Sequence, residues 1–255
     1  IETTGLADPA PILHTLVNDP LAFAKFQLDG VIATVDAVNG TATLDAYEEA
    51  VKQAAMADRI LLTKTDLAGD TKDLRSRLAA LNPGATVIEV QQGQVDPSAI
   101  LDLGPFKGET KPERVQAWLN AEAYQHEHHH GHHHDHADVN RHDAHIRAFC
   151  FVWNKPIAQM RLNFFTQLLS MLRGPDLLRV KGLVRVLERP DQPAVIHGVQ
   201  HVFHPVTWLD AWPGADRRTR IVFIVRNIEP KQIEELMASL TEDSQADAEA
   251  NHATT

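Results

Sequence analysis

In the first hundred residues of the chain, short apolar runs alternate with segments in which apolar residues recur every three or four positions. The runs predict buried strands, and the longer spacing predicts helices. A chain in which helices separate the strands favours a mostly parallel sheet with helices on both faces. The expected strands are residues 31–35, 60–63 and 86–90, and the expected helices start at Asp8-Pro9, cover residues 44–58 and 71–82, and start again at Asp96-Pro97. Residues 1–104 are therefore predicted to form an α/β domain.

The pattern changes after residue 145. Strands joined by short turns, with one long helix among them, indicate a smaller, mostly antiparallel α+β domain with helices on one face, over residues 146–240. Little apolar periodicity occurs between residues 105 and 145, so that segment is interpreted as a linker. Residues 241–255 are acidic, small and polar, as is typical of a disordered tail. Within the second domain we expect strands at 145–153, 177–187, 194–199, 201–206 and 219–225, and helices at 156–173 and 229–240.

Composition narrows the functional classes. The chain has 255 residues with a net charge of −10, which argues against non-specific nucleic-acid binding because phosphates would be repelled. Its apolar runs are too short to span a bilayer. The single cysteine, Cys150, suits a reducing compartment, so we expect the cytoplasm. The chain begins Ile-Glu-Thr-Thr-Gly without Met, and we expect it to be a fragment or a processed piece.

Several polar segments directly follow the predicted strands. In open parallel sheets, ligands bind beyond the carboxyl ends of the strands. Residues 2–5, 63–66 and 91–93, together with Asp36, are therefore candidates for one nucleotide-binding crevice. For Asp36 taken alone, capping of a helix is the favoured interpretation.

The segment Thr63-Lys64-Thr65-Asp66 follows the apolar strand at residues 60–63. A carboxylate such as that of Asp66 can accept hydrogen bonds from both the ring N–H and the exocyclic amine of guanine. Adenine presents the opposite pattern and would leave the charge unpaired. The aliphatic stem of Lys64 can lie across the base while its ammonium group stays hydrated. The pattern thus indicates a guanine-reading loop, and a solvated turn is the alternative.

A histidine tract lies between the two predicted domains. Neutral imidazole binds Zn, Ni, Cu and Co, and this run has no fixed ligand geometry, so it predicts loose capture of several ions. An engineered tag and a pH-responsive spacer are the alternatives. The candidate metal ligands are His126, His128, His129, His130, His132, His133, His134 and His136.

Three later histidines and the cysteine receive a structural interpretation. His197, His201 and His204 occur in predicted strands, where histidines are more often packed and hydrogen-bonded than bound to metal. Cys150 lies between two phenylalanines of a predicted strand and is expected to belong to the core.

Together these motifs resemble the CobW-like family of GTP-dependent metallochaperones, relatives of the nickel-delivery GTPases of urease and hydrogenase maturation. The resemblance extends to about residue 240, and the family often has histidine-rich insertions between its domains. Thr63 stands where many GTPases have Asn, a variant that the family uses. The matching segments are residues 1–9, 35–37 and 57–67 in the first domain, and 151–156, 161–162, 176–182, 212–213 and 219–224 in the second.

The resemblance implies a partial P-loop-type parallel sheet, followed by a CobW-type carboxyl-terminal domain. It implies that Glu2 orients the water shell of Mg²⁺, that Gly5 approaches the γ-phosphate of GTP, and that Thr63, Lys64 and Asp66 form the base-reading loop. It further implies delivery of Zn²⁺, or of Co²⁺ or Ni²⁺, to a client metalloprotein.

Two motifs of the family do not occur in the 255 residues: the phosphate loop G-x-x-x-x-G-K-[ST] and the metal motif C-x-C-C. Because the phosphate loop positions the phosphates, we assign GTP hydrolysis to a longer parent protein and expect no measurable turnover from this chain. Two alternatives stay open. One is a metal-buffering protein with a vestigial nucleotide site, and the other is a module that docks a client. The identity of the metal, the client and the oligomeric state are not encoded in any recognisable motif.

Overall fold

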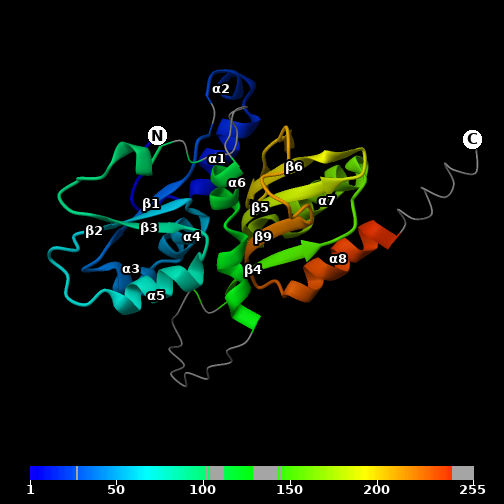
Figure 1. The fold of residues 1–255 in the computed structure, drawn as a ribbon. Helices are drawn as coiled ribbons and strands as arrows, with labels where there is room; N and C mark the ends of the chain where they lie inside the picture. Colours follow the sequence, from blue (N-terminus) through cyan, green and yellow to red (C-terminus); the bar gives the residue numbers. More distant parts are fainter. Residues whose placement is uncertain (27, 102, 104–111, 129–142, 144, 243–255) are drawn as a thin grey trace, which may run out of the picture.

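The computed structural model describes residues 1–26, 28–101, 103, 112–128, 143 and 145–242. Its two halves lie side by side, each built on its own sheet (Figure 1). The tail at 243–255 and most of the histidine tract fall outside the described residues. In the described part, no helix has both the length and the apolar character needed to cross a membrane.

The first half contains a three-stranded parallel sheet in the order β1-β2-β3, as the alternating pattern predicted. Its strands are β1 (Ile32–Asp36), β2 (Arg59–Thr63) and β3 (Thr86–Val90). Its helices are α1 (Pro9–Asn18), α2 (Pro20–Lys25), α3 (Gly40–Ala46), α4 (Glu48–Met56), α5 (Lys72–Leu81) and the 3₁₀ helix η1 (Pro97–Ala99). Asp8 caps α1 by accepting a hydrogen bond from the backbone N–H of Ala10.

Helices α3, α4 and α5 pack on one face of this sheet, around Ile60 and Leu62 of β2. The sequence pattern predicted helices on both faces. Successive right-handed crossovers in the order β1-β2-β3 place the connecting helices on the same side, which explains the difference. Ile32 and Thr34, which point to the opposite face, are exposed.

The helix predicted over residues 44–58 is divided in two. Tyr47 has extended backbone angles (φ −132°, ψ 117°), so α3 ends before it and α4 begins after it. The apolar spacing runs through this break because Leu44, Val51 and Ala54 all face the same core. Periodicity alone therefore could not detect the break.

The second half is built on a six-stranded antiparallel sheet in the order β4-β9-β5-β6-β7, with β8 paired to β6. The short strand β8 has no counterpart among the predicted elements. The strands are β4 (Ile146–Trp153), β5 (Leu177–Val186), β6 (Arg189–Val199), β7 (Val202–Phe203), β8 (Thr207–Trp208) and β9 (Thr219–Arg226). The helices are α7 (Gln159–Arg173), the 3₁₀ helix η3 (Gly174–Asp176) and α8 (Pro230–Glu242).

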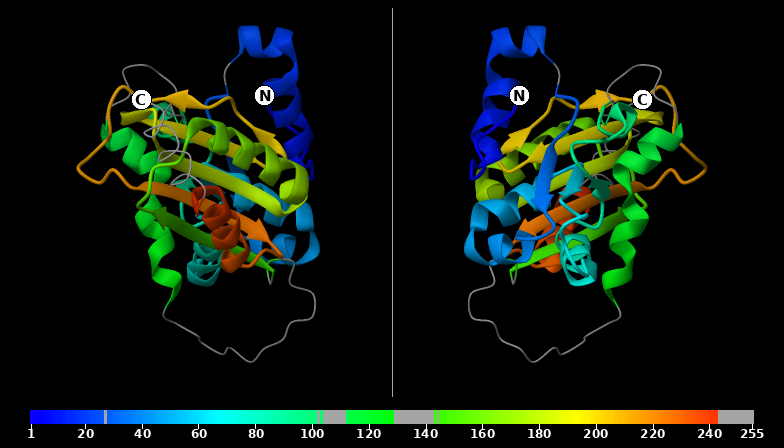
Figure 2. Two further views of the ribbon diagram at one scale, coloured as in Figure 1. Left: turned by 90° about the vertical axis from the view of Figure 1, so that its right-hand side faces the viewer. Right: turned by 90° about the vertical axis from the view of Figure 1, so that its left-hand side faces the viewer.

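Both faces of this sheet are covered. Helices α7 and α8 pack on one face, as predicted, with Phe165 and Met237 buried among the strand residues (Figure 2, left). The opposite face packs against α1, the end of α4, and two helices of the intervening segment, α6 (Pro112–Leu119) and η2 (Ala121–His128). Figure 1 shows α6 running between the two sheets.

Part of the segment interpreted as a linker is therefore packed structure. Val115, Trp118 and Leu119 of α6, together with Tyr124 of η2, belong to the core that joins the two halves. Tyr124 covers Gly84 so closely that a Cβ atom at residue 84 would lie 2.3 Å from the phenolic oxygen. The apolar spacing at residues 115–119 was the only sequence signal of this packing.

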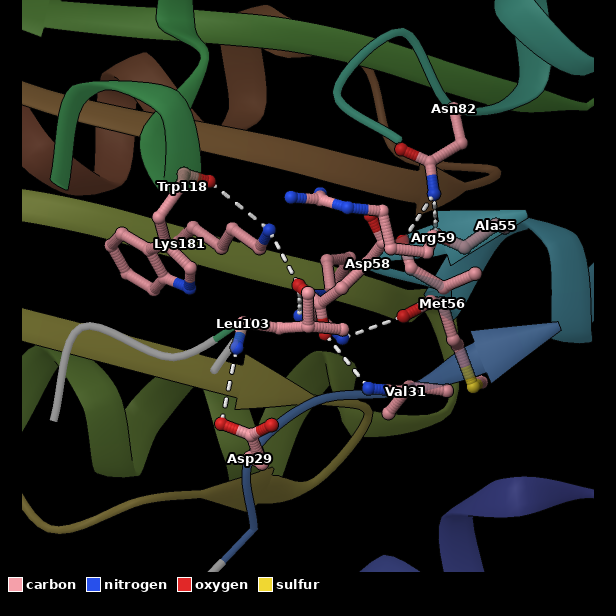
Figure 3. A network of polar contacts seen from close by, with 12 residues as sticks. Asp29, Val31, Ala55, Met56, Asp58, Arg59, Asn82, Leu103, Trp118 and Lys181 are labelled. Atoms are coloured by element: carbon pink, nitrogen blue, oxygen red, sulfur yellow. Dashed lines mark hydrogen bonds and ion pairs between the residues drawn. The ribbon is translucent and has the colours of Figure 1, made fainter. Parts of the chain in front are cut away.

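A buried polar network also joins the halves, at the amino end of β2 (Figure 3). Asp58 Oδ1 lies 2.5 Å from Arg179 Nη2 and 2.7 Å from Lys181 Nζ, both on β5. Its Oδ2 accepts a hydrogen bond from the N–H of Val31 at 2.9 Å. Lys181 also donates to the carbonyl of Trp118 at 3.1 Å. One carboxylate thus connects the first sheet, the second sheet and α6.

Backbone groups complete the network. Arg179 Nη1 donates to the carbonyl of Met56 at 2.6 Å. The amide nitrogen of Asn82 lies 2.9–3.0 Å from three carbonyl oxygens, those of Ala54, Ala55 and Ala57. These contacts provide hydrogen-bond donors to carbonyls at the end of α4.

Candidate functional site

The three strands of the first sheet end at one common edge, which is where the sequence predicted a ligand site. Asp36, Thr63 and Val90 are the last residues of β1, β2 and β3, and the register pairs Asp36 with Thr63 and Thr63 with Val90. The loops that follow the three strands therefore leave the sheet at the same level. This arrangement brings Asp36 and residues 63–66 together, as the sequence predicted.

Lys64 is held in place by Asp36. The Nζ of Lys64 lies 2.7 Å from Oδ2 of Asp36, and its backbone has a left-handed φ of 57°. The hydrogen bond from Lys64 is the largest cause that lowers the pKa of Asp36 to about 2. The Lys64 side chain is 54 % exposed, so its stem is accessible to a ligand while its ammonium group is anchored.

Asp36 does not cap α3, although its sequence position had suggested a cap: the N-cap residue is Asn39, which makes no side-chain capping bond, and Asp36 instead closes the turn that precedes the helix. Its Oδ1 accepts hydrogen bonds from the backbone N–H groups of Val38 at 2.7 Å and Asn39 at 3.2 Å. One carboxylate therefore holds both the turn before α3 and the lysine of the neighbouring loop. Its pairing with Lys64 was not predicted from the sequence, although the parallel register of the two strands makes them neighbours.

Asp66 lies in the turn that follows Lys64 and is exposed. The N–H groups of Leu67 and Ala68 donate to the carbonyl of Lys64 at 3.1 and 3.2 Å, which closes this turn. Within the described part of the chain, Asp66 makes no ion pair or side-chain hydrogen bond. Its carboxylate is thus available to accept hydrogen bonds from a ligand at the sheet edge.

Thr63 and Gln91 complete the described edge. Thr63 Oγ1 donates to the carbonyl of Val35 at 3.3 Å, and the carbonyl of Thr63 accepts from the N–H of Ala37 at 2.9 Å. Gln91 Nε2 donates to Thr65 Oγ1 at 3.3 Å. These bonds tie the base of the 63–66 loop to its two neighbouring strands.

Glu2 and Gly5 lie elsewhere in the described contacts. Gln53 of α4 donates from Nε2 to the carbonyls of Gly5, at 3.0 Å, and Ala7, at 2.8 Å. Among the described residues, no hydrogen bond or ion pair joins Glu2 or Gly5 to the 63–66 loop. Glu2 is exposed, and its carboxylate oxygens are of the type that Mg²⁺ prefers.

The candidate metal ligands of the histidine tract fall mainly outside the described residues: His129, His130, His132, His133, His134 and His136. His126 and His128 end the helix η2, and their side chains are also outside the description. Among the residues that are described, no group of three or more His, Cys, Asp or Glu is placed to hold a metal ion. The tract therefore stays a prediction.

His197 and His204 are packed in the second half, as expected. His197 is 3 % exposed, its ring stacks on that of His204 with centroids 4.7 Å apart, and it meets Trp118 edge-on. Burial lowers the pKa of His204 to about 4 and that of His197 well below its ordinary value, so both rings are neutral at pH 7.

Cys150 is half-buried in β4 and packs at the edge of the core between the halves. Burial raises the pKa of its thiol to about 11. A thiol in this state is a poor nucleophile and a poor metal ligand at neutral pH. The interpretation of Cys150 as a core residue agrees with this environment.

Comparison with known proteins gives matches in both halves. Residues 1–89 match the family model "CobW/HypB/UreG, nucleotide-binding domain", and residues 146–241 match "Cobalamin synthesis protein cobW C-terminal domain". Among curated proteins, the chain is 30% identical over 245 residues to the zinc chaperone YjiA of Escherichia coli. This match covers 94% of the chain and 70% of that protein. The chain is also 34% identical over 113 residues to the zinc-regulated GTPase metalloprotein activator 1 of Schizosaccharomyces pombe, covering 43% of the chain and 28% of that protein.

Solved structures agree with the sequence comparison. The Zn(II)-bound YjiA GTPase from E. coli superimposes with a TM-score of 0.68 at 27% identity, over 93% of the chain and 69% of that structure. A Zn(II)-bound triple mutant of the same GTPase gives a TM-score of 0.68 at 28% identity, over 92% of the chain and 68% of that structure. The order of the two halves is therefore the same as in these relatives.

Proposed function

Because the chain belongs to the CobW family, we propose that it acts in GTP-dependent metal delivery, as a metallochaperone that passes a divalent transition metal to a client metalloprotein. Relatives described as a zinc chaperone and as a zinc-regulated GTPase metalloprotein activator support this proposal and favour zinc over cobalt or nickel. A reducing compartment, the cytoplasm, suits a chain with a single cysteine.

The observation that carries the proposal is the arrangement at the end of β2. Asp66 is exposed without a described partner, two residues after a lysine that Asp36 anchors at 2.7 Å. An unpaired carboxylate beside an accessible aliphatic stem matches the N–H donors and the flat face of guanine. The proposed roles are therefore hydrogen bonding to the base by Asp66, stacking by Lys64, and support of the loop by Thr63.

For the phosphate end of the nucleotide, the family resemblance assigns Glu2 to the water shell of Mg²⁺ and the backbone of Gly5 to the γ-phosphate. The exposed carboxylate of Glu2 fits an oxygen-ligated ion. Bound Mg²⁺ would neutralise phosphate charge. Since no phosphate loop occurs in the sequence, we expect this chain to bind the base without measurable turnover.

The histidine tract is proposed to raise the local concentration of the metal near the transfer site. Closely spaced imidazoles offer interchangeable ligands to several ions, and tethering to the same chain raises the local concentration of those ions. A metal-buffering protein would bind the same ions, but its metal affinity would not respond to guanine nucleotide. A client-docking module would retain its function when residues 126–136 are removed.

The sharpest test replaces one carboxylate of the loop by an amide. Asp66→Asn should weaken GDP binding and improve binding of xanthosine diphosphate, because the amide donates where the carboxylate accepted. Competition titrations followed by NMR on the whole chain measure both nucleotides without requiring hydrolysis. Asp70→Asn is the matched control, since Asp70 is exposed in the same loop and its described side-chain contacts are with Lys72, through the backbone N–H at 2.9 Å and the ammonium group at 3.8 Å. An unchanged preference between the two bases in Asp66→Asn would refute the guanine-reading role.

A further inference from the structure

Two histidines from opposite halves of the molecule face each other at the surface. His14 lies on α1, and His201 lies in the turn between β6 and β7. Their ring centroids are 5.4 Å apart and their planes are inclined by 45°. Both residues are exposed, so a hydrated ion can reach the rings.

The backbone on each side of this pair is fixed by packing. Leu13, next to His14, is buried in the same core as Val199 of β6, so α1 sits directly on the second half. The carbonyl of His201 accepts a hydrogen bond from Ser170 Oγ at 2.6 Å. A Cβ atom at Gly174 would lie only 2.6 Å from the Cβ of His201, which shows how closely η3 packs on this turn. The proximity of the two rings therefore follows from the fold.

The separation of the rings suits a shared metal ion. With metal–nitrogen bonds of about 2.0–2.1 Å and a tetrahedral angle, two imidazoles on one zinc ion have ring centres roughly 5 Å apart. Direct stacking of the kind seen between His197 and His204 differs from this, with centroids 4.7 Å apart and planes inclined by only 11°. The rings of His14 and His201 are farther apart and tilted, at a spacing close to that of two imidazoles on one ion.

We propose that His14 and His201 form a divalent transition-metal site that bridges α1 and the β6–β7 turn, with water as the remaining ligands. Imidazole selects Zn²⁺, Co²⁺, Ni²⁺ or Cu²⁺ over Mg²⁺ and Ca²⁺, because the hard ions prefer oxygen ligands. Neither residue belongs to the histidine tract or to the loop at residues 63–66. It rests on the geometry of this pair and stands whether or not the chain reads guanine.

A metal ion in this position would join the two halves. The helix α1 directly follows the segment of Glu2 and Gly5, while the β6–β7 turn belongs to the second half. An ion that binds only the folded arrangement stabilises it in proportion to its occupancy. Zinc should therefore raise the unfolding temperature of the chain through this pair, in addition to any binding at the tract.

The test distinguishes zinc bound by His14 and His201 from zinc bound by the histidine tract. In the full chain, the tract histidines are first replaced by serine, and this background is titrated with ZnCl₂ by calorimetry at pH 7.5. We expect that His14→Ala and His201→Ala each remove one equivalent of bound zinc, and that the double variant loses no more than either single variant. His145→Ala is the matched control, because His145 is an exposed histidine of another turn and should leave the stoichiometry unchanged.

Two further measurements distinguish loss of the metal site from unfolding of the alanine variants. The double variant His14→Cys, His201→Cys should still bind the equivalent of zinc that the alanine variants lose, because thiolates also bind zinc. Addition of zinc should also raise its unfolding temperature, as in the parent background. Crystals soaked in ZnCl₂ should give an anomalous peak between the two rings. Equal stoichiometry in the background and in both alanine variants, or a zinc peak elsewhere with none at this pair, would overturn the proposal.

Discussion

The Nζ of Lys181 lies 2.7 Å from Oδ1 of Asp58, with both side chains buried between the two halves of the chain. The same oxygen receives Arg179, so one carboxylate faces two cations. Burial alone raises the pKa of Asp58, but the charges of Arg179 and Lys181 outweigh it and hold the pKa well below its usual range. Burial also lowers the pKa of Lys181 to about 8, despite the opposing effect of Asp58.

Removing the carboxylate should be costly. Asp58→Asn leaves Arg179 and Lys181 buried without an anion, and loss of one partner from a buried ion pair typically costs about 3–5 kcal/mol. Urea unfolding of the variant and the wild type measures this difference. Asp191→Asn is the control, because Asp191 pairs with Arg217 at the surface and should change stability by less than about 1 kcal/mol. Equal stability of Asp58→Asn and wild type would contradict the network.

Removing one of the two cations should cost much less. Lys181→Met keeps the apolar stem and leaves Asp58 paired with Arg179, so we expect a loss below about 1.5 kcal/mol, or a gain. The lowered pKa of Lys181 adds a pH dependence. Between pH 8 and its ordinary pKa of 10.5, the unfolded chain binds the proton that the folded chain has released. The stability of the wild type relative to Lys181→Met should therefore rise with pH over that interval.

Low pH should weaken the contact between Asp58 and its two cations, because the carboxylate becomes protonated. Because the folded pKa of Asp58 is depressed below its ordinary value of 3.8, its contribution is complete above about pH 4 and is lost as the pH falls further. As the pH is lowered from 6 to 2, the urea concentration at the unfolding midpoint should fall more steeply for the wild type than for Asp58→Asn. Parallel curves for the two proteins would show that the carboxylate does not contribute in this way.

At the sheet edge, Asp36→Asn should lower the affinity for guanine nucleotide while changing the folding stability only slightly. Asparagine can still accept the hydrogen bonds of the turn before α3 but loses the ion pair with Lys64, which is exposed enough to contribute less than about 1 kcal/mol to folding. A less firmly held Lys64 should lower the affinity for guanine nucleotide, by up to about tenfold if the pair contributes about 1.4 kcal/mol to binding. Nucleotide titration and thermal unfolding of the same variant check both parts. A large loss of stability with unchanged nucleotide affinity would assign Asp36 a structural role only.

Metal binding by the histidine tract can be tested by substitution of its histidines and by lowering the pH. If the tract captures metal, replacing its eight histidines by serine should remove several equivalents of bound zinc at pH 7.5. Acidification below about pH 6.5 should have the same effect on the wild type, because protonated imidazole does not bind metal. Equilibrium dialysis measures both. Unchanged zinc binding in the serine variant would leave the tract as a spacer.

The strands and most helices could be predicted because their signals are local. The residues of β3 were predicted without error, and the ends of β1 and β2 were within one residue of those observed. Asp8-Pro9 located the start of α1 through its capping chemistry. Where a local break interrupted a continuous apolar face, as at Tyr47, the prediction failed because the pattern reports burial and not backbone angles.

The contacts between the halves could not be predicted in the same way. Asp58 and Arg179 are 121 residues apart in the chain, and no local pattern pairs them. One signal was present: Arg179 and Lys181 are charged residues flanked by apolar residues within a strand, and buried charges require a partner. The packing of Trp118 and Tyr124 was hidden for a related reason, since their helices are short and adjoin the histidine tract.

Of the candidate site, the sequence identified the loop but not its support. The position of residues 63–66 after a strand was sufficient to place them at the carboxyl edge of the sheet, where the ligand site is predicted. The anchor of Lys64 depends on the register that sets Asp36 beside Thr63, which only the folded sheet defines. Residues 2 and 5 follow no described strand, so no register positions them.

Strand β2 carries Asp58 immediately before its first residue and Lys64 immediately after its last. It is the central strand, hydrogen-bonded to β1 on one side and to β3 on the other, and its five residues span only about 17 Å. A short strand that is hydrogen-bonded on both sides does not lengthen. A shift of the loop after Thr63 would therefore be passed along β2 to Asp58 and would strain its ion pairs with Arg179 and Lys181 in the second half.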